Sequence, residues 1–274
     1  MRIEHVTVRL PGHSLRARVR PGGDGAPPGV VWFEAGLGLD SSMWLPVMDT
    51  LDDHAETDGW TFLSPDRAGL GASTPGHREA TLTPTLRDAD AMLATAWAGP
   101  PTPLVLVGHS WGGTLQRLWS AAHPGSACAA VLVDASWEGG PEHPGREGRA
   151  ALTRLVHRGW EDVAETLLHD TGIRGLVPTL HAQLLELRRF VPSLDLLDHL
   201  SREGRDWMPG KTALLTTART RGAQVRVQRR FAEEHGWELR SAHTDSHMIP
   251  EQDPGSVATA ILRAITPAGA RRGR

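Results

Sequence analysis

Several residue types are scarce in this chain, and each shortage excludes a class of protein. The 274 residues include one cysteine, no tyrosine and a single lysine, Lys211. Because Cys128 stands alone, the chain cannot form an internal disulfide, and we expect a small buried apolar residue there. No apolar run approaches the roughly 18 residues that cross a bilayer, and Met1–Glu4 leads into strand-like sequence rather than a secretory signal. We therefore expect a soluble cytoplasmic protein without a membrane partner.

Neither the charge nor the histidine spacing points to nucleic acid or metal. Lys+Arg (29) and Asp+Glu (32) leave a formal net charge of −3 spread along the chain, which argues against a nucleic-acid partner. The 14 histidines show no His-Glu-x-x-His or Cys/His ligand spacing, so we expect no metal and no cofactor. The hydrophobic fraction, 39%, is ample for a packed core, and the length suits one α/β domain or a core with an insertion.

Short apolar runs alternate with helix-compatible segments over most of the chain. The expected strands are Ile3–Leu10, Leu15–Arg20, Val30–Phe33, Trp60–Ser64, Leu104–Val107, Ala129–Val133, Thr212–Thr216 and Trp237–Ser241. The expected helices are Met43–His54, Thr83–Trp97, Thr114–Ala122, Ala223–His235 and Pro254–Ile265. The first two strands are expected to pair as an antiparallel hairpin at a sheet edge. The alternation predicts a doubly wound, mostly parallel α/β sheet that binds ligands at the carboxyl ends of its strands.

Residues 137–210 interrupt this alternation. They show no strand pattern, only segments with the spacing of amphipathic helices. The expected helices are Ala150–His157, Val163–Leu168 and Thr179–Phe190, and the expected breaks are Gly159, Gly172, Gly175, Pro178 and Pro192. We interpret 137–210 as an all-helical cap inserted between two parts of the core, 1–136 and 211–266, with a disordered tail at 267–274. Because the cap leaves after a strand end, it should cover the carboxyl edge of the sheet and shape a pocket there.

The stretch Gly108–Gly112 matches the motif G-x-S-x-G. A buried strand precedes it and a helix follows, which is the context that gives this common pattern its meaning. The glycines allow a sharp turn, and the serine at its apex, Ser110, is exposed above the start of a helix with strained backbone angles. We predict that Ser110 is a nucleophile and that the backbone N–H of Trp111, which follows it, stabilises an oxyanion.

A serine hydroxyl needs a base, and the base needs a third group to orient it. The best-placed histidine is His247, in a loop between the last strand and the last helix. His243 in the same loop is the rival, and His109 beside the serine is expected to be structural.

These stretches together resemble the α/β-hydrolase family over nearly the whole chain. Gly108–Gly113 matches its nucleophile elbow, and Ser246–Pro254 matches its histidine loop. Pro65–Ser73 is similar to its D-x-x-G-x-G-x-S segment, and Glu34–Gly38 resembles the His-Gly-x-Gly turn, with Ala35 where histidine is common. The resemblance implies a serine hydrolase with a helical cap, and it implies that the N–H of Leu37 is the second oxyanion donor. Asp66 and Arg67 are expected to form a structural network under the site.

The acid of the expected triad departs from the commonest pattern of the family. Many members carry it after the strand that follows the cap, but Thr216–Thr220 contains no carboxylate. Some members place it after the strand that follows the nucleophile helix, and Asp134 occupies that position here. A carboxylate directly after a buried strand is costly without a partner, and an imidazolium would be one. Asp245 and Glu138 are the alternatives.

The sequence therefore predicts a serine hydrolase that cleaves an ester-like bond of a small molecule through Ser110, His247 and Asp134. Trp44 and Trp137 fall near predicted strand ends and are candidates for an apolar substrate pocket. Lactonase, proline-iminopeptidase and cofactor-free perhydrolase reactions use the same triad and stay open as alternatives. A ligand-binding protein that keeps the fold without catalysis is a further alternative. The oligomeric state is not predicted.

Overall fold

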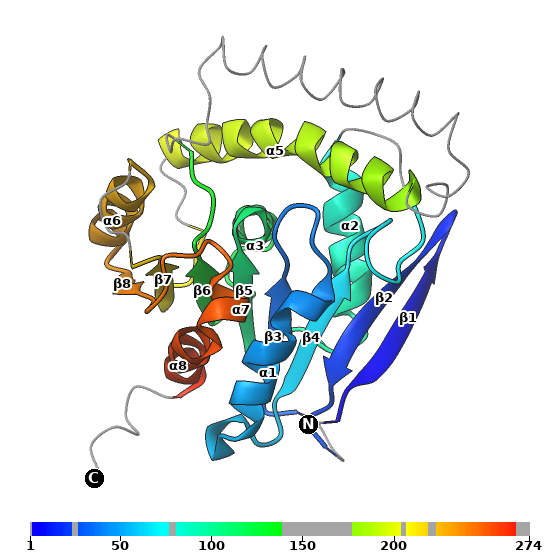
Figure 1. Ribbon diagram of the computed structural model, residues 1–274, viewed down its shortest axis with the longest axis horizontal. Helices are drawn as coiled ribbons and strands as arrows, with labels where there is room; N and C mark the ends of the chain where they lie inside the picture. The colour runs from blue at the N-terminus through cyan, green and yellow to red at the C-terminus, as the bar shows by residue number, and fades with distance from the viewer. Residues whose placement is uncertain are drawn as a thin grey trace.

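A computed structural model describes residues 2–23, 27–76, 81–138, 177–203, 207–218 and 223–266 of the chain. An eight-stranded sheet forms its centre, with the strand order β1-β2-β4-β3-β5-β6-β7-β8 (Figure 1). The strands are β1 Glu4–Leu10, β2 His13–Arg20, β3 Val30–Glu34, β4 Thr61–Asp66, β5 Leu104–His109, β6 Ala129–Val133, β7 Thr212–Thr216 and β8 Glu238–Ser241. The pairs β1–β2 and β2–β4 are antiparallel and all the others are parallel. The predicted α/β fold, including its edge hairpin, is confirmed.

Helices cover both faces of the sheet and bury its central strands. On one side lie α1 (Leu45–Asp52) and α8 (Pro254–Ile265); on the other lie α2 (Thr83–Leu93), α3 (Trp111–Ala122) and α6 (Ala223–His235). Short helices complete the described chain: η1 Ser41–Trp44, η2 Ala55–Thr57 and α7 Ile249–Gln252. Strands β3 to β7 are buried at every residue, as expected when helices cover both faces.

One long helix, α5 (Val177–Arg202), lies across the carboxyl ends of the strands (Figure 1). The predicted break at Pro192 is wrong, because α5 continues through this proline. A proline inside a helix costs about 3 kcal/mol. The fully buried side chains of Leu194 and Leu197 follow it, and burying a leucine contributes about 1.5–3 kcal/mol. The free energy gained by burying this face of α5 therefore outweighs the cost of Pro192 within the helix.

Two expected helices and the tail cannot be compared with the structure, and the prediction for Cys128 is wrong. The expected helices Ala150–His157 and Val163–Leu168 and the tail 267–274 lie outside the described residues. Cys128 is exposed rather than buried, because it belongs to the loop before β6 and not to the strand. In the described part of the chain, no helix combines the length and the apolar character needed to cross a membrane.

Candidate functional site

Ser110 lies at the sharp turn between β5 and α3, at the carboxyl edge of the sheet. Its backbone has φ 52° and ψ −123°, a backbone conformation that residues other than glycine rarely adopt. Hydrogen bonds hold the turn from both sides: the Ser110 N–H donates to the carbonyl of Val133 at 3.0 Å, and its carbonyl accepts from Ser136 at 3.2 Å. A Cβ at Gly108 would lie 2.6 Å from the Cα of Gly113, so the turn requires glycine there. The chain thus fixes a strained serine at the start of a helix.

His247 and Asp134 are brought together at the same edge although 113 residues separate them. The Nδ1 atom of His247 lies 2.7 Å from Oδ2 of Asp134. Asp134 follows β6 directly and is buried, whereas the side chain of His247 is half-exposed. A buried carboxylate on Nδ1 fixes the ring orientation and leaves Nε2 as the atom that can accept a proton.

His109, the residue before the serine, supports the histidine loop. Its Nε2–H donates to the carbonyl of His247 at 2.8 Å, and the two rings lie 4.7 Å apart, centre to centre. Burial, followed by the nearby His247 ring, lowers the pKa of His109 to about 4. His109 is therefore a neutral donor at neutral pH, in agreement with the structural role expected for it.

The Ser110 hydroxyl makes no hydrogen bond to His247 or to any other residue that the structure describes. Catalytic hydrogen bonds are often long without a substrate and tighten when one binds. The backbone N–H groups of Leu37 and Trp111 also have no acceptor among the described residues. Leu37 follows β3 and Trp111 is the first residue of α3, so both donors belong to the elements expected for an oxyanion hole.

The other candidates for the triad make different contacts. Glu138 accepts two hydrogen bonds from Arg117, at 2.6 and 2.7 Å, and one from Ser201 at 2.8 Å. This ion pair lowers the pKa of Glu138 against the opposing effect of burial, which is the larger single influence on it. His243 points to solvent, with 91% of its side chain exposed, and Asp245 is exposed. Glu138 is thus committed to Arg117 of α3 and Ser201 of α5, and the only carboxylate that the structure describes near the His243 ring is that of Asp253, 3.7 Å from its Nδ1.

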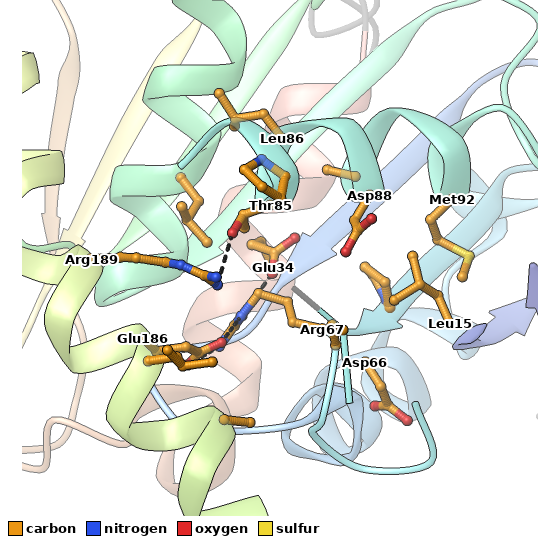
Figure 2. Close-up of a pocket in the computed structure, with 18 of the residues that line it drawn as sticks. Leu15, Glu34, Asp66, Arg67, Thr85, Leu86, Asp88, Met92, Glu186 and Arg189 are labelled. Carbon is orange, nitrogen blue, oxygen red and sulfur yellow. Dashed lines mark hydrogen bonds and ion pairs between the residues drawn. The ribbon is translucent and has the colours of Figure 1, made fainter. Parts of the chain in front are cut away.

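A buried ionic cluster lies beside the predicted oxyanion loop and contains two residues that the sequence did not single out. Arg67 donates to Oε1 of Glu34 at 2.7 Å and, through two nitrogens, to Glu186 of α5 at 2.5 and 3.0 Å (Figure 2). Desolvation raises the pKa of Glu34, opposed by Arg67. Asp66 accepts from the Ser41 and Ala72 N–H groups at 2.9 Å each, so the expected network under the site is present. A motif could not indicate Glu186, because it meets Arg67 only across 119 residues.

A cavity of about 370 Å³ lies between the sheet, α2 and α5, beside this cluster (Figure 2). Its apolar lining includes Leu15, Trp32, Met92, Leu115, Trp119 and Leu185. Glu34, Arg67 and Glu186 also line it. Ser110 and His247 do not line it, but Arg67 connects it to the loop that carries Leu37, because Arg67 also donates to the Gly36 carbonyl at 2.7 Å.

The two tryptophans predicted to line a substrate pocket are fully buried elsewhere. Trp44 packs against Phe33, and Trp137 lies under Arg117 and beside Phe231. Neither lines the cavity, so their role in substrate binding stays a prediction. No group of three or more potential metal ligands occurs among the described residues.

Known proteins resemble this chain in sequence and in structure. The family model of the alpha/beta hydrolase family matches residues 30–260. The uncharacterized protein YqjL of Bacillus subtilis (strain 168) is 28% identical over 128 residues, which is 47% of each chain; the match thus spans about half of that protein. The epoxide hydrolase VrEH1 from Vigna radiata has a similar structure, with a TM-score of 0.68 and 15% identity over 96% of this chain and 97% of that one. The thioesterase domain from the curacin biosynthetic pathway superposes with a TM-score of 0.64 and 15% identity, over 96% and 100% of the two chains. At such identities the likeness concerns the fold. The family match over most of the chain shows that this protein belongs to the alpha/beta hydrolase family.

Proposed function

We propose that this protein is a serine hydrolase that cleaves an ester bond of a small apolar molecule. The observation that carries the proposal is the contact between His247 and buried Asp134 at the edge where Ser110 occupies a strained turn. Family membership supports hydrolysis in general, and a serine at the turn supports attack by a hydroxyl group.

In the proposed reaction, Ser110 Oγ attacks the ester carbonyl while Nε2 of His247 takes the hydroxyl proton. Asp134 orients the ring and stabilises its cationic form. The backbone N–H groups of Leu37 and Trp111 donate to the developing oxyanion. His247 then protonates the leaving alkoxide, and the acyl-enzyme forms. A water molecule gives a proton to His247 and attacks the acyl carbon. His247 then gives this proton to Ser110 Oγ as the bond from that oxygen to the acyl carbon breaks, which releases the acid and restores the serine.

The cavity beside Arg67 supports an apolar substrate group of limited size. Its volume, about 370 Å³, is near the lower end of ligand pockets. Most of the residues that line it are apolar, and Asp66, Asp88 and Arg189 add charged groups to those of the cluster. We propose that the acyl or alcohol part of the ester occupies it. A panel of chromogenic esters with increasing acyl length tests this, with Ala89→Phe as a variant that reduces the cavity. Activity should fall for long acyl groups and be kept for acetate.

The decisive test of the proposed function is labelling with an organophosphonate, which modifies only an activated serine. We expect stoichiometric modification of Ser110, no modification of Ser110→Ala, and normal modification of the control Ser126→Ala. Turnover of Ser110→Ala should be lower by roughly 10⁶. Esterase activity that survives Ser110→Ala would overturn the proposal, and absence of both labelling and turnover in the unmodified protein would favour a ligand-binding role.

A further inference from the structure

The loop after β3 is held by side chains at four successive peptide groups. Arg67 donates to the carbonyls of Ala35 at 2.8 Å and Gly36 at 2.7 Å. Glu186 Oε2 accepts from the N–H of Gly38 at 2.6 Å, and Gln183 Nε2 donates to the carbonyl of Gly38 at 3.1 Å. Glu186 and Gln183 both belong to α5, so the cap helix holds half of these contacts.

Two of these contacts determine the direction of the Leu37 N–H. A trans peptide group is planar, with its C=O and N–H pointing in opposite directions. The Gly36 carbonyl and the Leu37 N–H share one such group, so Arg67 orients that N–H by binding the carbonyl on its other side. The Gly38 N–H belongs to the next peptide group, and Glu186 fixes that one. The peptide groups before and after Leu37 are therefore both held by the ion pair of Arg67 and Glu186, which we call the Arg67–Glu186 pair.

The same pair also reaches the other oxyanion donor. The guanidinium of Arg67 lies over the ring of Trp111, 5.2 Å from its centre. The indole N–H of Trp111 in turn donates to Ser193 Oγ of α5 at 3.1 Å. Arg67 is thus packed between the two residues whose backbone N–H groups would form the oxyanion hole, and α5 contacts both sides of this arrangement.

Charge and burial make Glu186 necessary for this position of Arg67. Arg67 and Glu186 are both buried, at 9% and 3% exposure. Glu186 contacts Arg67 through two oxygens, whereas Glu34 contacts it through one (Figure 2). Removing one partner of a buried ion pair leaves a charge without compensation. Without Glu186, the guanidinium would keep a single carboxylate partner, and the Gly38 N–H would lose its acceptor.

We propose that Glu186 is a positioning residue that holds the Leu37 N–H, through Arg67 and the Gly38 N–H, in the orientation of an oxyanion donor, so that docking of α5 completes the oxyanion hole. This inference rests on the proposed function and adds to it a residue of α5 that acts on the oxyanion hole through Arg67 and the Gly38 N–H, not by contact with the reacting atoms. It makes the cap part of the catalytic machinery as well as a cover.

The experiment compares Glu186→Ala and Glu186→Gln with Ser201→Ala. Ser201 also joins α5 to the core, through Glu138, but it has no contact with the loop. We expect Glu186→Ala to lower kcat about 10²-fold with KM changed less than threefold, as for the loss of one oxyanion donor. Glu186→Gln keeps an acceptor for the Gly38 N–H and should lose less. Ser201→Ala should keep its kcat.

A trifluoromethyl ketone separates positioning from general destabilisation, because its adduct with serine carries an oxyanion. Its inhibition constant should rise in Glu186→Ala by the same factor as kcat falls, while Ser201→Ala binds it normally. A fall in kcat with unchanged binding of this inhibitor would overturn the inference, and so would an unchanged kcat in Glu186→Ala.

The amide resonance of Leu37 in the ¹⁵N-labelled protein gives a readout that does not depend on activity. It should shift in Glu186→Ala and not in Ser201→Ala. If the unmodified protein neither hydrolyses esters nor reacts with organophosphonate, the proposed function fails, and this resonance alone decides whether Glu186 positions the loop. A resonance that stays in place would overturn the positioning role.

Discussion

At the scale of single residues, Asp134 combines a strained backbone with a buried charge. Its φ of 41° lies in the left-handed region, which costs energy for any residue with a side chain, although aspartate tolerates it better than most. A hydrogen bond of 2.6 Å from its N–H to the Leu215 carbonyl holds it there. This conformation accompanies a carboxylate that reaches Nδ1 of His247 across the sheet edge. Strain of this kind gathers at functional sites, where the surrounding structure maintains it.

Asp134→Asn tests the role of this carboxylate. The amide keeps the size of the side chain but can donate to Nδ1 of His247, which favours the tautomer with the proton on Nε2 and prevents that atom from accepting one. We expect turnover of a chromogenic ester to fall by about 10⁴. Thermal melting should show that the variant is folded.

Asp245→Asn is the matched control, since Asp245 is an exposed carboxylate two residues from His247. It should leave turnover within about twofold of the unmodified protein. If Asp245→Asn loses activity and Asp134→Asn keeps it, Asp134 is not the triad acid.

At the scale of elements, α3 and the end of β3 approach so closely that only glycine fits between them. A Cβ at Gly112 would lie 2.3 Å from the Glu34 carbonyl oxygen and 2.4 Å from that of Ala35. The first turn of α3 therefore packs directly on the backbone that leads to Leu37. This contact brings the Trp111 and Leu37 segments together at the site.

Gly112→Ala should be among the most damaging small substitutions in the chain, because backbone rather than a flexible side chain opposes the added methyl. We expect a loss of about 3 kcal/mol or more in the free energy of unfolding, comparable to an overpacked core. Urea denaturation measures it. Gly255→Ala is the control, since the nearest atom to its Cβ lies 3.9 Å away and it is exposed in α8. It should be neutral or stabilising by about 0.5–1 kcal/mol. Equal stability of the two variants would contradict the close approach.

The proline inside α5 gives a second prediction at this scale. Pro192 cannot donate to the helix, so Pro192→Ala should stabilise the protein by about 1–3 kcal/mol in urea denaturation. Pro254→Ala is the control, because Pro254 is the first residue of α8, where proline costs nothing. A Pro192→Ala protein that is less stable than the unmodified one would mean that the packing of α5 depends on a bend at this residue.

The sequence predicts the centre of the sheet well because its central strands are buried on both faces and form continuous apolar runs in the sequence. It also places Ser110, Asp134 and His247 at one edge, since each follows a predicted strand. It does not predict the path of α5 through Pro192 or the meeting of Arg67 with Glu186. Both depend on packing between segments far apart in the chain, and neither leaves a local pattern.

At the scale of the whole molecule, proton binding by His109 links the site to the stability of the fold. The pKa of this buried histidine is lowered from 6.5 to about 4, mainly by burial and then by His247. Between these two pH values the unfolded chain binds a proton at His109 that the native protein does not. The free energy of unfolding therefore rises with pH in this window and is lost as pH falls from 6.5 towards 4. Above 6.5 the contribution is complete.

His109→Gln tests this linkage, because glutamine keeps an N–H donor for the His247 carbonyl but does not titrate. At pH 7 the variant should be less stable, since its side chain fits the buried site less well. As pH falls from 6.5 to 4, the stability of the unmodified protein should drop by up to about 3 kcal/mol more than that of the variant. Urea denaturation at several pH values measures the two curves, with exposed His243→Gln as the control that should follow the unmodified protein.

A difference between the His109→Gln and unmodified curves that does not change with pH would mean that His109 is protonated in the native protein as readily as in the unfolded chain. The histidine beside Ser110 would then carry a positive charge at the site below pH 6.5, and the neutral donor to His247 would exist only above it.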